Sequence, residues 1–89
     1  MKTLKDILDN DNMRDDALKK VFSSQLKTIR EDRELSQNAV AAQLGCAVST
    51  YANWEQGRRE PSIVDIYNLI YVFKIDANEL FDIEKDTFL

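Results

Sequence analysis

The stretch from Ser36 to Pro61 constrains this chain most, because signals for the start and end of helices follow one another there within a few residues. Ser36 is a residue type that caps the N-terminus of a helix. Gly45 is the type that ends a helix, since glycine adopts the left-handed backbone conformation without steric cost. Only Cys46 and Ala47 separate Gly45 from a second periodic segment. The stretch therefore predicts two short helices joined by a tight turn.

The apolar residues of these two segments predict which helix faces are buried. Val40, Ala41 and Leu44 recur at helical spacing in the first, while Tyr51 and Trp54 are three residues apart in the second. The remaining surface of the second helix carries short side chains: Val48, Ser49, Thr50, Ala52 and Asn53. A small, largely polar helix face is of the kind that enters the major groove of DNA. The arrangement predicts a helix-turn-helix.

A longer set of matches runs in register from about Gln25 to Phe81, or roughly two-thirds of the chain. It comprises Leu26, Ile29, Arg30, Leu35, Ser36, Gln37, Val40, Ala41, Leu44, Gly45, Tyr51, Trp54, Glu55, Gly57, Pro61, Ser62, Ile66, Leu69 and residues 76–80. On these residues the chain resembles the Cro and phage-repressor family of helix-turn-helix proteins, also called the XRE family. The resemblance implies an all-α fold: a compact five-helix lambda-repressor-like DNA-binding domain, here with an N-terminal helical extension.

The resemblance also implies which residues contact DNA. In similar proteins the glutamine that opens the second helix binds a phosphate and supports the base-reading side chains, and the readers lie at the start of the third helix. Carried to this chain, with the two arginines that follow the helix, the set is Gln37, Val48, Ser49, Thr50, Asn53, Arg58 and Arg59. Lys27 is a weaker phosphate contact. The alternative for the reading residues is an ordinary solvated helix face.

Two positions depart from the family pattern. Ala47 stands where a Ser or Thr usually caps the recognition helix, and alanine has no side-chain acceptor for a backbone N–H. Glu34 stands where the family often has glycine after the first helix, so a left-handed backbone there costs about 1 kcal/mol. The readers are also short: Asn53 can pair with adenine and Val48 can contact a thymine methyl, but no long side chain reaches guanine.

Arg30 and Glu55 are predicted to serve the fold. In similar proteins these positions form a partly buried ion pair between the first helix and the end of the recognition helix, a role that suits the forked guanidinium of arginine. The alternative is that Arg30 is a free phosphate contact.

Two further helices are predicted beyond Pro61, which stops continuation from upstream. Ser62 with Asp65 three residues later predicts a capping box and a fourth helix. Its apolar face is predicted to comprise Ile63, Ile66, Leu69, Ile70 and Phe73. Asp76 and Glu79 repeat the box, so a short fifth helix carrying Leu80 and Phe81 should close the core.

The fourth helix carries a second apolar stripe made of Val64, Tyr67 and Tyr71. It is interpreted either as core or casual exposure, or as a dimer contact. A homodimer would place two recognition helices one DNA turn apart, which suits a palindromic operator.

The N-terminal segment is the least typical part. Its first stripe (Leu4, Ile7, Leu8) is interrupted at residues 10–12, and a second helical pattern follows at Leu18, Val21, Phe22, Leu26 and Ile29. Either the first helix begins before Gln25, or Ser23 or Ser24 caps a fresh helix. We divide the chain into an N-terminal helical extension (1–23), a helix-turn-helix domain (24–82) and a C-terminal tail (83–89). The extension could pack on the body, mediate self-association or hold a partner protein.

The net charge of −4 is unusual for a DNA-binding chain, but its distribution is uneven. Residues 1–23 contain five basic and five acidic side chains, and residues 24–62 again contain five of each. Residues 63–89 contain two basic against six acidic ones and so account for the whole −4. The acidity therefore lies downstream of the motif. Nonspecific DNA affinity should be weak and strongly dependent on salt.

The sequence contains few features that are typical of enzymes, metal-binding proteins or membrane proteins. It has no histidine, no glycine-rich phosphate loop and a single cysteine, so we expect no enzyme activity, no cofactor and no metal. No apolar run approaches the roughly twenty residues that span a bilayer, and the N-terminus lacks a secretory stretch, so we expect no membrane association and a cytoplasmic protein. The favoured function is a sequence-specific double-stranded DNA-binding transcriptional regulator, most simply a dimeric repressor that inserts residues 48–56 in the major groove. The alternative is a protein-interaction module, such as an antitoxin or adaptor.

Overall fold

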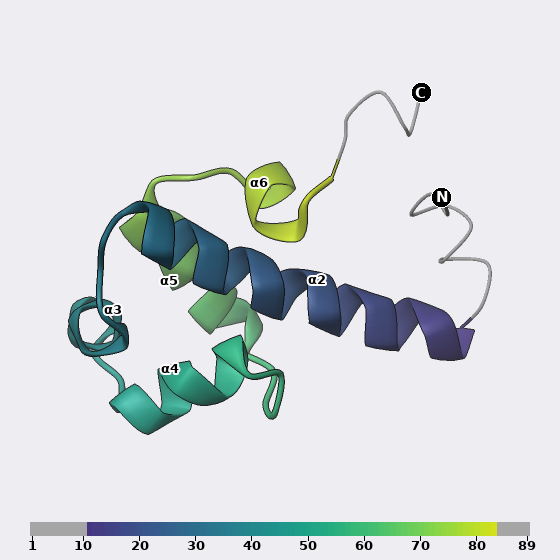
Figure 1. The fold of residues 1–89 in the computed structure, drawn as a ribbon, viewed down its shortest axis with the longest axis horizontal. Coiled ribbons are helices and arrows are strands. Elements are labelled where there is room, and N and C mark those ends of the chain that lie inside the picture. The colour runs from purple at the N-terminus through teal and green to yellow at the C-terminus, as the bar shows by residue number, and fades with distance from the viewer. Residues whose placement is uncertain (1–10, 84–89) are drawn as a thin grey trace.

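The computed structural model describes residues 11–83, and within that range all regular structure is α-helical. The described residues form five helices, which Figure 1 labels: α2 (Asp11–Asp32), α3 (Gln37–Leu44), α4 (Val48–Glu55), α5 (Ile63–Phe73) and α6 (Ala77–Phe81). The predicted all-α, five-helix fold is confirmed. The predicted stripe of Leu4, Ile7 and Leu8 lies outside the described residues, as does nearly all of the predicted tail.

The first helix of the domain is longer than the motif requires. α2 is a single helix that continues through Ser23 and Ser24, so neither serine caps a new helix. It crosses the boundary that we placed between residues 23 and 24. In Figure 1 the first turns of α2 reach beyond the other helices, with α3 and α4 on one side of its axis and α6 on the other. The part of the extension from residue 11 to residue 23 is therefore continuous with the body.

The core lies where α2 meets the other four helices. Five large side chains are fully buried there: Leu26, Val40, Tyr51, Leu69 and Leu80. Phe22 on α2 packs against Phe81 on α6, with ring centroids 5.5 Å apart. Complete burial of an apolar side chain contributes about 1.5–3 kcal/mol. Every helix from α2 to α6 thus contributes to a common apolar centre.

Most of the predicted helix signals are confirmed. The Ser36 hydroxyl accepts the Ala39 N–H at 3.0 Å, and Gly45 ends α3 with a φ of 74°. Ser62 and Asp65 form the full capping box. Asp76 accepts the Glu79 N–H at 2.8 Å, but the structure gives no reciprocal bond from the Asp76 N–H, so the second box is only half formed.

The turn between α2 and α3 contains the predicted left-handed residue. Glu34 has a φ of 56°, a conformation that is costly for a side chain with a Cβ atom. Leu35 follows and donates its N–H to the Arg30 carbonyl at 3.2 Å. This closed turn brings the start of α3 back beside the last turn of α2.

The apolar face predicted for α5 needs one correction. Leu69 and Phe73 are buried, and Ile66 and Ile70 pack against the core, but Ile63 is 84% exposed. Ile63 lies in the first turn of α5, where its chain neighbours Ser62 and Val64 are also exposed. It therefore belongs with the exposed stripe.

The second stripe of α5 is not part of the core. Val64, Tyr67 and Tyr71 are 63%, 67% and 74% exposed. With Ile63 they form a continuous apolar surface, which we call the α5 face. Within residues 11–83, no helix has both the length and the apolar character needed to cross a membrane.

Candidate nucleic-acid interface

The joint between α3 and α4 is built from small residues and one left-handed glycine. Ala41 is 2% exposed on the inner side of α3, where a larger side chain would separate the helices. The Cys46 N–H donates to the Ala41 carbonyl at 3.1 Å and closes the turn. Cys46 is half-buried against the core, where burial raises the pKa of its thiol. A Cβ atom on Gly45 would meet nothing within 4 Å, so its positive φ alone favours glycine there.

The four predicted readers lie on α4, opposite its buried side. Tyr51 and Trp54 are 0% and 4% exposed and fix the inner side of this helix. Val48 is 41% exposed and Ser49 is exposed, while Thr50 and Asn53 are half-buried. The Ala47 backbone is extended at φ −67° and ψ 145°, and no side chain caps the helix there. The first N–H groups of α4 therefore have no side-chain acceptor.

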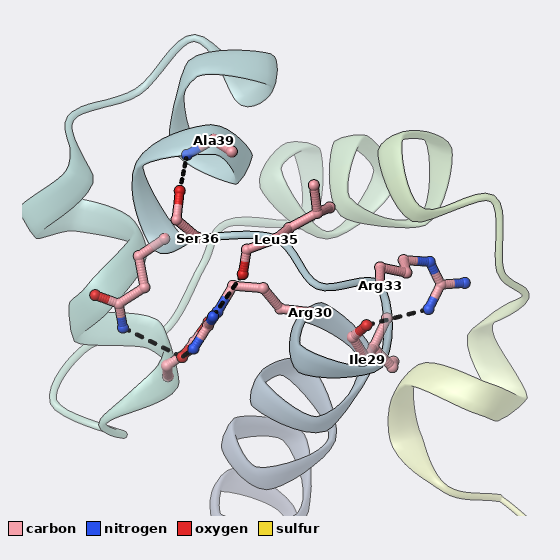
Figure 2. Close-up of polar contacts among 8 residues, drawn as sticks. Ile29, Arg30, Arg33, Leu35, Ser36 and Ala39 are labelled. Atoms are coloured by element: carbon pink, nitrogen blue, oxygen red, sulfur yellow. Dashed lines mark hydrogen bonds and ion pairs between the residues drawn. The ribbon is translucent and has the colours of Figure 1, made fainter.

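Arg30 joins three segments of the chain (Figure 2). Its Nε donates to Glu55 Oε2 at 2.6 Å and its Nη2 donates to Glu55 Oε1 at 3.0 Å, a bidentate ion pair. Its Nη1 donates to the Leu35 carbonyl at 2.7 Å. The side chains of Arg30 and Glu55 are only 13% and 2% exposed. The predicted ion pair is confirmed, and the guanidinium is engaged on both sides, which argues against the alternative of a free phosphate contact.

Gln37 is hydrogen-bonded to the same Glu55 carboxylate. Its Nε2 donates to Glu55 Oε1 at 3.2 Å, and the side chain is half-buried. Since Nε2 carries two hydrogens, one N–H remains for another acceptor. Glu55 therefore connects α2, the start of α3 and the end of α4.

The hydrogen bonds of this network favour the charged forms of Arg30 and Glu55. Burial alone would raise the pKa of Glu55, but the hydrogen bonds from Arg30 and Gln37, together with the adjacent Tyr51 hydroxyl, outweigh it and hold the pKa below its ordinary value. The hydrogen bond to Glu55 raises the pKa of Arg30. Burial strongly raises the pKa of the neighbouring Tyr51 phenol. The Tyr51 hydroxyl has no hydrogen-bond partner among the described residues.

The two arginines follow α4 on a short loop. Gly57 turns the chain with a φ of 72°, and the Arg58 N–H donates to the Asn53 carbonyl at 2.9 Å. Arg58 and Arg59 are exposed, and neither forms an ion pair with another residue in the range 15–83, whose side chains the structure describes. Lys27, the weaker candidate, is also exposed on α2. Both arginines are therefore accessible to a phosphate.

Two supports of this loop were missed by the sequence reasoning. The Ser23 hydroxyl donates to the Trp54 carbonyl at 3.0 Å, and its oxygen lies 3.3 Å from where a Cβ atom on Gly57 would be. Lys19 Nζ lies 2.9 Å from Glu60 Oε1 in an exposed ion pair. Both tie the loop to α2. A serine within an amphipathic helix gives no signal of such a partner, because the contact spans 31 residues.

Comparisons with known proteins agree with this geometry. A family model described as helix-turn-helix matches residues 26–80. The control protein C.MunI of Mycoplasma sp is 36% identical over 67 residues, which cover 73% of this chain and 90% of the relative. The cryptic phage CTXphi transcriptional repressor RstR of Vibrio cholerae is 30% identical over 60 residues, covering 67% of this chain and 54% of the repressor.

A third relative and a solved structure are also similar to this chain. The uncharacterized HTH-type transcriptional regulator YqaE of Bacillus subtilis is 33% identical over 67 residues, covering 66% of this chain and 58% of the relative. The crystal structure of the restriction-modification controller protein C.AhdI from Aeromonas hydrophila superimposes with a TM-score of 0.68 at 32% identity. That match covers 73% of this chain and 98% of C.AhdI. The chain thus spans nearly all of both controllers but little more than half of RstR and YqaE.

Proposed function

This chain belongs to the XRE-type helix-turn-helix family, and from that membership we propose that it represses transcription as a homodimer bound to a palindromic DNA operator. It is a DNA-binding transcriptional regulator, as its relatives are. The family and the named relatives are regulatory proteins rather than enzymes. The protein-interaction alternative is not favoured by them.

The observation that carries the proposal is the accessible outer side of α4 on a braced helix pair. Glu55 receives Arg30 and Gln37, so α3 and α4 keep one relative orientation without DNA. The proposed base readers are Val48, Ser49, Thr50 and Asn53. Preorganised readers avoid the entropy cost of ordering the helices on binding.

The proposed phosphate contacts surround the readers in sequence. Gln37 has one free N–H at the start of α3, and Arg58 and Arg59 extend from the loop after α4. The uncapped start of α4 supplies backbone N–H groups and the positive end of the helix dipole. Each phosphate that a cation neutralises adds about −0.9 to the slope of log affinity against log salt, so with few cations the affinity should be low and its loss with rising salt moderate.

Base recognition would rest on short side chains. Asn53 is suited to adenine and Val48 to a thymine methyl. Ser49 and Thr50 can bond to several base edges directly or through water. We therefore propose that DNA shape and bridging water contribute to the preference of this protein.

The homodimer is supported by the α5 face. Four exposed apolar side chains on one helix form a larger patch than scattered surface exposure explains. A two-fold pairing of α5 with its copy would bury this face and set two α4 helices on one side of DNA.

A more specific target is suggested by the two relatives that the match covers over nearly their whole length. The chain covers nearly the full length of two proteins named as a control protein and a restriction-modification controller, but about half of the phage repressor. We therefore place the operon of a restriction–modification system first among candidate targets, and phage genes second.

Selection of bound fragments from random double-stranded DNA, at two salt concentrations, tests the proposal. We expect enrichment of a palindrome with half-sites about one helical turn apart. An enriched site without two-fold symmetry would contradict the dimer. No enrichment at the lower salt concentration would contradict sequence-specific DNA binding.

A further inference from the structure

A groove beside the N-terminal half of α2 plays no part in the proposed DNA contacts. Its volume is about 290 Å³, and its apolar walls are Leu18, Phe22, Pro61, Ile66 and Phe81. One water occupies about 30 Å³ in the liquid, so the groove has room for a bulky side chain. We call it the α2 groove. Leu18 and Phe22 precede residue 26, where the family match begins, so one wall lies outside the family module.

The rim of the α2 groove is polar. Asp15 and the Lys19–Glu60 ion pair border it. Leu18 remains 42% exposed beside them. An apolar floor with donors and acceptors at its edge suits a side chain that has an apolar body and a polar tip, which is the character of tyrosine.

The groove adjoins the α5 face. Ile66 lines the groove, while Ile63, one turn earlier, and Tyr67, the next residue, are exposed on α5. Leu18 is thus connected through Ile66 to the surface proposed for dimer contact. The two features form one apolar region that crosses from α2 to α5.

The α5 face by itself is small for a stable dimer. Four side chains of this size offer on the order of 500 Å² per copy, whereas a stable interface of standard size buries about 800 Å² per partner. The adjoining groove supplies apolar surface that could provide the rest of this interface area.

We propose that the α2 groove receives Tyr71 of a second copy, so that the N-terminal half of α2 completes the dimer. The proposal rests on the homodimer proposed above. In a two-fold pairing of antiparallel α5 helices about Tyr67, residues four before and four after it face each other, so Ile63 of one copy lies opposite Tyr71 of the other. Because Ile63 lies one helical turn before Ile66, which lines the groove, this pairing directs Tyr71 of the second copy toward the mouth of the groove. The ring then contacts Leu18, and the hydroxyl meets the polar rim.

The test is a double-mutant cycle between Leu18 and Tyr71 on the full chain. The dimer dissociation constant is measured by sedimentation equilibrium for the wild type, Leu18→Glu, Tyr71→Ala and the double variant. Thr28→Glu adds the same charge to an exposed position of α2 that does not line the groove, and serves as the control. Thermal melts of dilute samples check the fold. If Leu18→Glu lowers the melting temperature, Leu18→Ala replaces it.

We expect each single variant to weaken the dimer at least tenfold, the double variant to weaken it by much less than the product, and Thr28→Glu to stay within twofold. If Tyr71→Ala weakens the dimer while Leu18→Glu behaves like Thr28→Glu, or if the two effects multiply, the groove proposal is wrong and the homodimer stands. If the wild type stays monomeric at every concentration, both proposals are wrong.

Discussion

Glu55 lies at the end of α4, the proposed recognition helix, and binds Arg30 of α2 through two hydrogen bonds, of 2.6 and 3.0 Å, with the Glu55 side chain 2% exposed. The same carboxylate accepts the amide of Gln37. One buried charge therefore holds the first helix, the start of α3 and the end of α4 together. The Arg30–Glu55 pair therefore fixes the positions of the helices that carry the proposed DNA-binding surface.

Replacing Glu55 by Gln should destabilise the protein strongly. The change leaves Arg30 without its counter-charge in a site of low exposure, which typically costs about 3–5 kcal/mol. Urea unfolding monitored by circular dichroism gives the free energy of unfolding. Glu60→Gln is the matched control, because its ion pair with Lys19 is exposed and should contribute less than about 1 kcal/mol. Equal losses at the two positions would contradict the buried role.

The Glu55 pair should also make stability depend on pH in acid. Because the folded-state pKa of Glu55 is lowered, its stabilisation is complete above the ordinary value of 4.5 and is lost as pH falls through the folded pKa. The difference in unfolding free energy between wild type and Glu55→Gln should be constant from pH 7 to about 5 and shrink below 4.5. A difference that grows on acidification would reverse the sign of this shift.

The buried Tyr51 hydroxyl should be dispensable. It lies next to the Glu55 carboxylate without forming a hydrogen bond of normal geometry, and an unsatisfied buried polar group lowers stability. Tyr51→Phe keeps the ring and should leave the free energy of unfolding unchanged or raise it by up to about 1 kcal/mol. Tyr67→Phe, at an exposed position, should be neutral. A loss above about 1 kcal/mol in Tyr51→Phe would indicate that the hydroxyl has a stabilising partner.

A cap can be added to the recognition helix. Ala47 already has the extended backbone of an N-cap residue, but no side-chain acceptor. Ala47→Ser should accept a free N–H of the first turn of α4, as Ser36 does in α3, and stabilise the fold by about 1 kcal/mol. The midpoint of urea unfolding measures the gain, with Ala47→Gly as the comparison. A Ser variant less stable than wild type would show that the geometry does not admit a cap.

The two loop arginines should contribute to affinity without setting sequence preference. Arg58→Ala and Arg59→Ala should each reduce the slope of log affinity against log salt by about 1, with uniform weakening across DNA sequences. Asn53→Ala should instead change the preferred base at one position of the site. Fluorescence anisotropy with operator and scrambled duplexes separates these outcomes. Unchanged salt slopes in both arginine variants would remove the loop from the interface.

The helix boundaries around the motif could be predicted because their causes are local. Ser36 and Gly45 act on backbone groups within a few residues, and the structure contains the expected cap and left-handed turn. The Arg30–Glu55 pair was found only through resemblance, since nothing near either residue identifies its partner 25 positions away. The DNA contacts of the seven proposed residues stay a prediction.

Other features needed the assembled fold. Ile63 has the periodicity of a core residue, yet it is 84% exposed, because spacing defines a helix face but not how far the body extends over it. Ser23 was interpreted as a possible helix start, but it lies within α2 and bonds to the Trp54 carbonyl.

The sequence by itself therefore determined the helices, the turn and the family, since caps, glycine and apolar periodicity act over a single turn of chain. Tertiary structure alone decided that Glu55 receives Gln37 as well as Arg30, that α2 continues through the predicted boundary, and that a groove opens beside the α5 face. These three features depend on how helices that are distant in the chain pack against one another. That packing is decided by burial and long-range hydrogen bonds together.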